Sequence, residues 1–232
     1  MRTSNKILIS FLIFLFSGII ALYVGSKYYA NPNNNPANFV DKKTKLSPFS
    51  VIVAESGAVF YLNSGKENEI TQNHLKDTVP DFGSFIVRND TLFIASAKLK
   101  RNKDRFTNNL IHVSCTNVKS IVTKEYSEVR MEEFQVDTLS VTMNKSNLEL
   151  RFKNISYISL QAKDSEIYLE GERLGNLAIK LDKTRINSSI KKRTDVLSGS
   201  LINASDLRFS MSNAVTLDAD DTSNYDFYNH AN

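Results

Sequence analysis

The 232-residue chain contains no tryptophan and a single cysteine, and these two shortages limit how it can be stabilised and what it can bind. A lone cysteine cannot form an internal disulfide, so the fold must be stabilised by packing. Cys115 follows Ile111 and Val113 at alternate positions, a pattern that predicts a small buried apolar side chain. Without tryptophan, an aromatic platform for a sugar would have to use tyrosines such as Tyr157 and Tyr168.

Familiar catalytic and metal-binding motifs are also missing. The sequence has no Gly-rich phosphate loop, no nucleophile elbow and no HExxH motif. Of the three histidines, His74 is expected in a loop, His112 on the outward side of a strand and His230 in the C-terminal tail, and none has a partner at metal-ligand spacing. The acidic residues of 218–221 lack the glycine that a calcium loop uses for its turn, which favours a polar cap or tail over a calcium site. We therefore expect no catalytic residues, no cofactor and no metal.

The excess of positive over negative charge is small once the N-terminus is set aside. Without Arg2 and Lys6, 27 basic residues remain against 25 acidic ones, and 27 − 25 leaves a net charge of +2. So balanced a surface does not favour nucleic acid as a partner.

Long apolar runs are absent except at the N-terminus, where residues 7–24 carry no charge. Eighteen such residues are long enough to cross a hydrocarbon core about 30 Å thick as a helix. The alternative is a cleaved secretory signal, but the candidate cleavage sites place a bulky tyrosine, Tyr23 or Tyr28, where a small residue is needed. No cysteine follows the run, so lipid attachment has no acceptor. The prediction is an uncleaved signal-anchor that contacts the lipid bilayer.

The charges around this segment predict its orientation. Arg2 and Lys6 precede it, so the positive-inside rule makes residues 1–6 a short cytoplasmic end. Residues 25–46 are rich in asparagine and lysine and are expected to form a polar tether. The chain is thus predicted to be a single-pass membrane protein whose main domain is extracytoplasmic, on the periplasmic or cell-surface side.

Apolar residues alternate with polar ones from Phe49 onward. Phe85–Val87 and Thr91–Ile94 flank the turn residues Arg88-Asn89-Asp90, which predicts a β-hairpin. No twelve-residue stretch outside the apolar segment shows a 3.6-residue period. The domain is therefore predicted to be all-β, over residues 47–217, with a cap or tail at 218–232.

A repeat of about 20 residues fills the second half of the domain. Each copy has three alternating apolar residues, two polar residues, a hydroxyl residue and two more alternating apolar residues. The hydroxyl residues are Ser146, Ser165, Thr184 and Ser205, at steps of 19, 19 and 21. Two short strands joined at a tight corner form one turn of a single-stranded parallel β-helix, or β-solenoid, in which stacked turns bury the alternate residues. A small hydroxyl can bond to local backbone at the corner.

The residues after these hydroxyls are outward-facing in this register. They are Asn147, Glu166, Arg185 and Asp206, so stacking about 4.8 Å apart would form a ladder in which the last three charges alternate in sign. We interpret this ladder as structural, with a ligand site as the alternative.

These patterns resemble the bacterial "putative auto-transporter adhesin, head GIN domain" family of the Gram-negative envelope. The resemblance covers roughly residues 48–217, from the opening around Pro48–Val53 to the stacked units. It implies a parallel β-helix outside the cytoplasm and carries over no catalytic residue. The family often has glycine at the corner, where this chain has Lys145, Asp164, Lys183 and Ala204.

The sequence therefore predicts a non-enzymatic binding or adhesion module of the cell envelope, whose partner is an envelope protein or a glycan. A scaffold that assembles with itself or with other envelope proteins is the alternative. A polysaccharide-degrading β-helix enzyme is a minor alternative, since such enzymes need paired carboxylates on an exposed face. Its candidate residues would be Asp164, Glu166, Glu170, Glu172 and Arg185.

Overall fold

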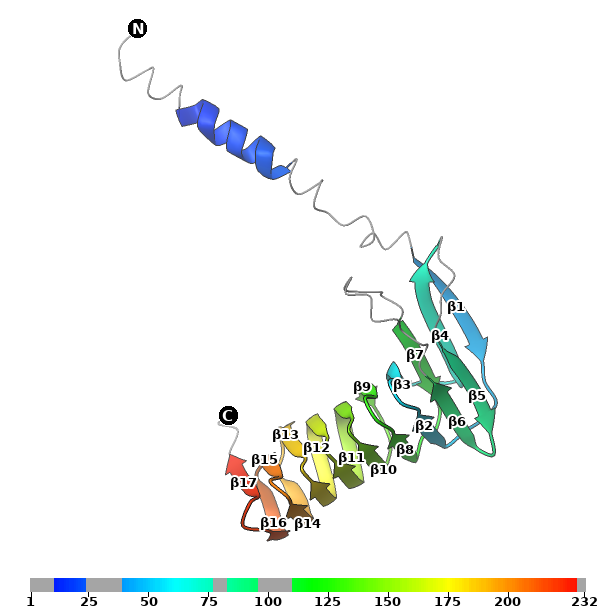
Figure 1. The fold of residues 1–232 in the computed structure, drawn as a ribbon, viewed down its shortest axis with the longest axis vertical. Helices are drawn as coiled ribbons and strands as arrows, with labels where there is room; N and C mark the ends of the chain where they lie inside the picture. Colours follow the sequence, from blue (N-terminus) through cyan, green and yellow to red (C-terminus); the bar gives the residue numbers. More distant parts are fainter. Residues whose placement is uncertain (1–10, 24–38, 77–82, 96–109, 229–232) are drawn as a thin grey trace. The chain divides into compact units, whose positions relative to one another are not determined.

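The computed structural model describes residues 11–23, 39–76, 83–95 and 110–228 (Figure 1). Contacts divide the chain into two units. The N-terminal unit comprises residues 1–40 and 75–78, and the β-domain comprises residues 41–74 and 79–232.

The N-terminal unit contains a helix at residues 11–23, whose apolar side chains are exposed all round. Within the described ranges, no helix combines the length and apolar character that crossing a bilayer requires. The predicted membrane segment of residues 7–24 extends beyond this helix at both ends, into residues outside the described ranges.

Strands make up the regular structure described after this helix. Their bounds are β1 (Phe39–Lys45), β2 (Val51–Ala54), β3 (Val59–Ser64), β4 (Glu69–Leu75), β5 (Ser84–Arg88), β6 (Thr91–Ala95), β7 (Leu110–Cys115), β8 (Ser120–Thr123), β9 (Glu128–Phe134), β10 (Thr138–Asn144), β11 (Asn147–Lys163), β12 (Glu166–Asp182), β13 (Arg185–Ile190), β14 (Thr194–Ile202), β15 (Asp206–Ser210), β16 (Ser212–Ala219) and β17 (Asn224–Tyr228).

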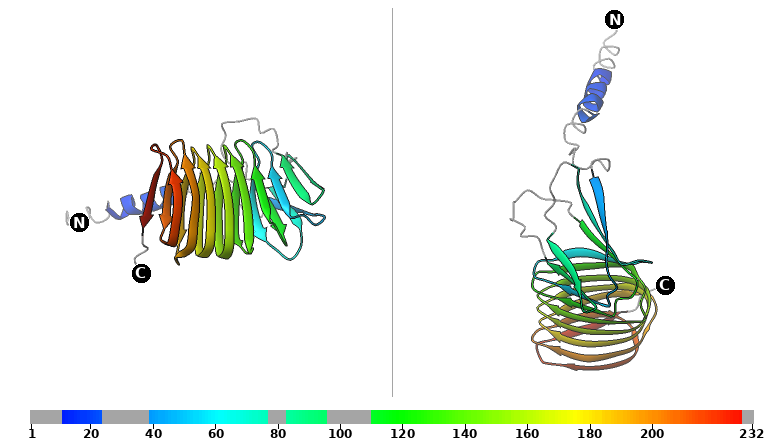
Figure 2. Two further views of the ribbon diagram at one scale, coloured as in Figure 1. Left: turned by 90° about the horizontal axis from the view of Figure 1, so that it is seen from below. Right: turned by 90° about the vertical axis from the view of Figure 1, so that its right-hand side faces the viewer.

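From β8 to β17 each turn of the chain consists of two strand segments joined at a corner, and successive turns stack in parallel (Figure 2). Leu139 pairs with Ile158, Ile158 with Leu177 and Leu177 with Leu197. The first half of β11 and of β12 belongs to one turn and the second half to the next. The predicted all-β solenoid, with turns of about 20 residues, is confirmed.

The first turns do not stack in the order of the sequence. Strand β2 lies between β6 and β8, and β3 lies between β7 and β9, with all four pairings parallel. The turn made by β2 and β3 is therefore inserted between two turns that follow it in the chain. The chain leaves this turn, forms the β6–β7 turn beside it and then returns to continue on its other side.

Antiparallel strands close this end of the solenoid. Strand β4 pairs antiparallel with β7, and β5 pairs antiparallel with β6. Ile70 is fully buried, and Phe85 and Val87 pack against the core. Asn89 and Asp90 have φ angles of 48° and 61°, as a tight hairpin turn requires, so the predicted hairpin is confirmed.

Two predictions about this end need correction. His74 was expected in a loop but belongs to strand β4, and strand β1 begins inside the predicted tether. The polar sequence of β1 gives no hydrophobic signal. The strand pairs with β4, and Lys43 and Lys45 form ion pairs of 3.3 Å and 2.8 Å with Glu69 and Glu67 at the surface.

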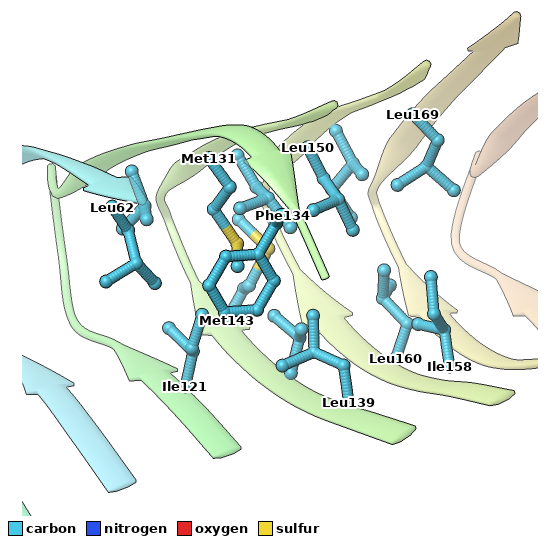
Figure 3. Close-up of a cluster of buried hydrophobic side chains, with 14 of the residues drawn as sticks. Leu62, Ile121, Met131, Phe134, Leu139, Met143, Leu150, Ile158, Leu160 and Leu169 are labelled. Atoms are coloured by element: carbon cyan, nitrogen blue, oxygen red, sulfur yellow. The ribbon is translucent and has the colours of Figure 1, made fainter. Parts of the chain in front are cut away.

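The core is a set of apolar columns that run along the solenoid (Figure 3). Leu62, Met131, Leu150 and Leu169 occupy equivalent positions in consecutive turns, and each is fully buried. Full burial of such a side chain stabilises the fold by about 1.5–3 kcal/mol. Because side chains alternate along every strand, the residues between these columns face solvent.

The predicted corner hydroxyls form a buried hydrogen-bonded column. Ser165 Oγ accepts a bond from the Ser146 N–H at 3.2 Å and donates to Lys163 O at 2.7 Å. Thr184 Oγ1 accepts from the Ser165 N–H at 3.3 Å and donates to Asp182 O at 2.9 Å. The column also includes members that the repeat did not reveal. These are Ser127 at one end, and Ser223, whose Oγ accepts from the Ser205 N–H, at the other.

The residue before five of these hydroxyls has a left-handed backbone; the five are Ser127, Ser146, Ser165, Thr184 and Ser205. The φ angles are 61° at Tyr126, 48° at Lys145, 47° at Asp164, 48° at Lys183 and 62° at Ala204. This conformation suits glycine and is costly for other residues. The corner is thus the place where a glycine would relieve backbone strain.

Candidate binding surface

The outward side chains of the second strand in each turn form a surface that we call the charged face. It is built on β9, the first halves of β11 and β12, β13 and β15. Alternation along these strands brings its residues outward, and the parallel register brings them into rows that cross the turns. The face includes Glu128, Arg130, Asn147, Glu149, Arg151, Glu166, Tyr168, Glu170, Arg185 and Asp206.

The predicted charge ladder is one of these rows. Asn147 pairs in register with Glu166, Glu166 with Arg185, and Arg185 with Asp206. Arg185 Nε lies 3.5 Å from Asp206 Oδ2. Among the described residues, no ion pair joins Glu166 to a cation, so its carboxylate is available to a ligand.

A more continuous network of ion pairs joins the ladder row to the two rows beside it. Arg130 Nη2 lies 2.6 Å from Glu128 Oε1, and its Nε lies 3.8 Å from Glu149 Oε2. The hydrogen bond to Glu128 raises the pKa of Arg130. Arg151 continues the network, with contacts of 2.6 Å to Glu149 and 3.2 Å to Glu170.

The row that contains Arg130 continues toward β7 with two aromatic rings, Tyr61 and His112. Arg130 Cζ lies 5.6 Å from the ring centroid of Tyr61, and the Tyr61 and His112 rings stack with centroids 5.0 Å apart. The stacking and the cation–π contact hold Arg130 in place. His112 alternates outward from its strand, as predicted.

Three shallow hollows lie along the charged face. One of about 410 Å³ is lined by Asp164, Glu166, Lys183 and Arg185. A second, of about 210 Å³, lies between Arg130 and Tyr168. A third, of about 240 Å³, is lined by Arg151, Glu170, Glu172 and Lys191. Shallow hollows on a rigid surface fit an extended polar ligand better than an enclosed small molecule.

The candidates for polysaccharide cleavage are divided between two of these hollows. Asp164, Glu166 and Arg185 line the largest, whereas Glu170 and Glu172 line another. Glu166 and Glu170 are four residues apart on one strand, or roughly 13 Å.

The two tyrosines predicted as sugar platforms lie on different faces. Tyr168 is on the charged face and Tyr157 is on the first strand segment of its turn, in the row of Thr138 and Asn176. Their exposed fractions are nearly equal, at 39% and 40%. The structure therefore does not bring them together into one platform.

Two further residues considered in the sequence analysis, Cys115 and Asp220, stabilise the fold. Cys115 is buried as predicted, and burial raises the pKa of its thiol to about 12. Asp220, in the predicted cap, accepts hydrogen bonds from the backbone N–H of Asn203 and from Ser223 Oγ at 2.7 Å each. In the described part of the chain, no three His, Cys, Asp or Glu residues are placed to hold a metal ion. His230 lies outside the described residues.

Comparisons with known proteins show the fold. No protein-family model matches the chain, and no curated protein sequence does. A solved structure from Bacteroides fragilis, described as a putative adhesin, is 12% identical with a TM-score of 0.58, over 82% of this chain and 97% of its own. A putative lipid binding protein from Parabacteroides distasonis is 13% identical, with a TM-score of 0.42 over 83% of this chain and 98% of its own. At such identities the first likeness shows a shared β-solenoid arrangement and nothing about ligands.

Proposed function

We propose that this chain is a membrane-tethered binding module of the cell envelope, and that it binds a protein or glycan on the charged face outside the cytoplasm. The observation that carries the proposal is that three hollows follow one another along a single face of a rigid solenoid. Interleaved carboxylates and guanidinium groups supply both acceptors and donors of hydrogen bonds. A polar polymer lying across several turns would meet both.

The tether is the second part of the proposal. The uncharged run of residues 7–24 and the exposed apolar side chains of the helix at 11–23 support insertion into a bilayer. Arg2 and Lys6 favour a cytoplasmic N-terminus, which places the β-domain on the periplasmic or cell-surface side.

Membership of the head GIN domain family belongs to the same proposal. The family often has glycine at the solenoid corner, and the corner of this chain has a left-handed backbone at Lys145, Asp164 and Lys183. A backbone conformation that suits glycine, at the positions where the family often has it, supports a common architecture. On this proposal the module binds without catalysis.

The matched tyrosines provide a direct test of the binding face. A photoreactive phenylalanine derivative would replace Tyr168 on the charged face or, as a control, the equally exposed Tyr157 on the other face. Full-length tagged chains would be crosslinked in intact cells, and the adducts identified as protein or glycan. We expect one dominant adduct from position 168 and none from position 157. Equal labelling from both positions, or an adduct from 157 alone, would rule out the charged face.

Topology needs a separate measurement. Extraction of membranes at alkaline pH should leave the chain in the pellet, and protease added to the extracytoplasmic side should degrade the β-domain. A chain released at alkaline pH, or protected from the protease, would contradict the tether and its orientation.

A self-assembling scaffold is the second candidate. One observation favours it: within the described ranges, no strand pairs with the outer edges of β16 and β17. Concentration-dependent assembly of the chain, measured by sedimentation, would support a scaffold.

A further inference from the structure

The two ends of the solenoid differ in how their strand edges are completed. At the N-terminal end, antiparallel β4 and β5 occupy the outer edges of β7 and β6. At the other end, β16 pairs only with β14, and β17 pairs only with β15, among the described residues. In the described part of the chain no further strand pairs with the outer edges of β16 and β17, and such an edge can pair with an added strand.

Core positions are uncovered at this open end. Val215 is 44% exposed, whereas Leu197, its register partner in the preceding turn, is fully buried. Tyr225 is 54% exposed, whereas Leu207 beneath it is fully buried. A further strand with inward apolar side chains would cover these residues as each earlier turn covers its neighbour.

The charge of the last turn indicates the chemistry of that strand. After Arg208 the chain has four aspartates and no lysine or arginine. Asp218 and Asp226 alternate outward from β16 and β17, and within the described residues neither forms an ion pair. Two copies meeting through this end would place aspartates against aspartates, which is unfavourable.

We propose that the C-terminal end of the solenoid, formed by β16 and β17, is a strand-addition site for an extended cationic segment of a partner protein. The segment continues the solenoid by one further layer, with apolar side chains over Val215 and Tyr225. Its lysine or arginine side chains lie on the alternate positions, next to Asp218 and Asp226. Backbone pairing supplies affinity, and the aspartates supply selectivity.

Fluorescent peptides test this site on the full-length chain in a neutral detergent. The probe is a peptide of alternating lysine and valine, and the controls are its glutamate–valine counterpart and a lysine peptide with proline in place of valine. Proline lacks the N–H that strand addition needs, so the second control isolates charge alone. Binding would be measured by anisotropy, with amide hydrogen exchange to locate the peptide.

Asp218→Lys/Asp226→Lys is the diagnostic variant, and Glu125→Lys/Asp137→Lys, which reverses two solvent-accessible carboxylates away from both this end and the charged face, is its matched control. We expect the lysine–valine peptide to bind and to slow exchange in β16 and β17, and the double variant to weaken binding by about tenfold. Glu125→Lys/Asp137→Lys should bind like the wild type.

Four results would overturn the site: no binding of the lysine–valine peptide, equal binding of the proline control, equal weakening by Glu125→Lys/Asp137→Lys, or exchange protection that rises with protein concentration without peptide. The last would mean that a second copy occupies this end. None of these results concerns the adducts formed at position 168, so the two proposals fail separately.

Discussion

Substituting glycine for alanine at two positions should change stability in opposite directions. Ala204 precedes the corner hydroxyl Ser205 and has a left-handed φ of 62°, whereas Ala214 lies in strand β16. Both side chains are exposed, so neither substitution opens a cavity. We expect Ala204→Gly to stabilise the β-domain and Ala214→Gly to destabilise it.

The magnitude follows from two contributions. Glycine gains freedom in the unfolded chain, which costs about 0.5–1 kcal/mol at either position. At Ala204 alone, glycine also removes the cost of a left-handed residue with a Cβ, about 1–2 kcal/mol. The net expectation is a gain of about 0.5 kcal/mol for Ala204→Gly and a loss of about 0.5–1 kcal/mol for Ala214→Gly. Since the unfolded-state contribution cancels, the difference between the variants, about 1–2 kcal/mol, measures the backbone strain at the corner.

Thermal unfolding of the full-length chain, followed by far-ultraviolet circular dichroism in detergent, would test this prediction. At about 2–4 °C per kcal/mol for a domain of this size, the two midpoints should differ by roughly 2–8 °C. If Ala204→Gly lowers the midpoint as much as Ala214→Gly does, the left-handed corner carries no strain and the reasoning is wrong.

Three further predictions concern the corner and the turns. Thr184→Val should cost about 1–3 kcal/mol because it leaves the buried Ser165 N–H without an acceptor, whereas Thr184→Ser should cost less than about 1 kcal/mol; urea unfolding would compare them. Gly199→Ala should destabilise by about 2–4 kcal/mol, because φ is 142° there and an added Cβ would collide with the Ile179 carbonyl; equal midpoints would contradict this. Hydrogen bonds, the largest from a backbone N–H, lower the pKa of Asp220 from 3.8 to about 2, so its contribution to stability is present above pH 4 and lost as the pH falls toward 2. The stability difference between the wild type and Asp220→Asn should therefore be largest at neutral pH and shrink over that range.

Much of the solenoid could be predicted because its signals are local. The hydroxyls at 146, 165, 184 and 205 have apolar residues at the same relative positions in every turn, so one register explains all four. The repeat did not predict Ser127 and Ser223 as corner hydroxyls because the apolar pattern around them is less regular. Strand β1 was not predicted because its polar residues show no apolar period, and its pairing with β4 leaves no pattern in the sequence.

The candidate surface was predictable only in part. The row of Glu166, Arg185 and Asp206 follows from the repeat, and the structure confirms that these residues pair in register. The network of Arg130 with Glu128 and Glu149 depends on side-chain conformation across turns, which the sequence does not specify. Nor could the repeat show that Tyr157 and Tyr168 are equally exposed on different faces.

The sequence by itself determined the class of fold, the inward and outward residues and the place of each corner. It could do so because the side-chain period of a strand is two and the turn repeats within about 20 residues, so that these properties are local. Only the tertiary structure decided that the β2–β3 turn inserts between two later turns, that antiparallel strands pair along one end, and that β16 and β17 have no further strand beside them among the described residues. These features depend on backbone hydrogen bonds between segments distant in the chain, and such bonds carry no residue-specific pattern along the sequence.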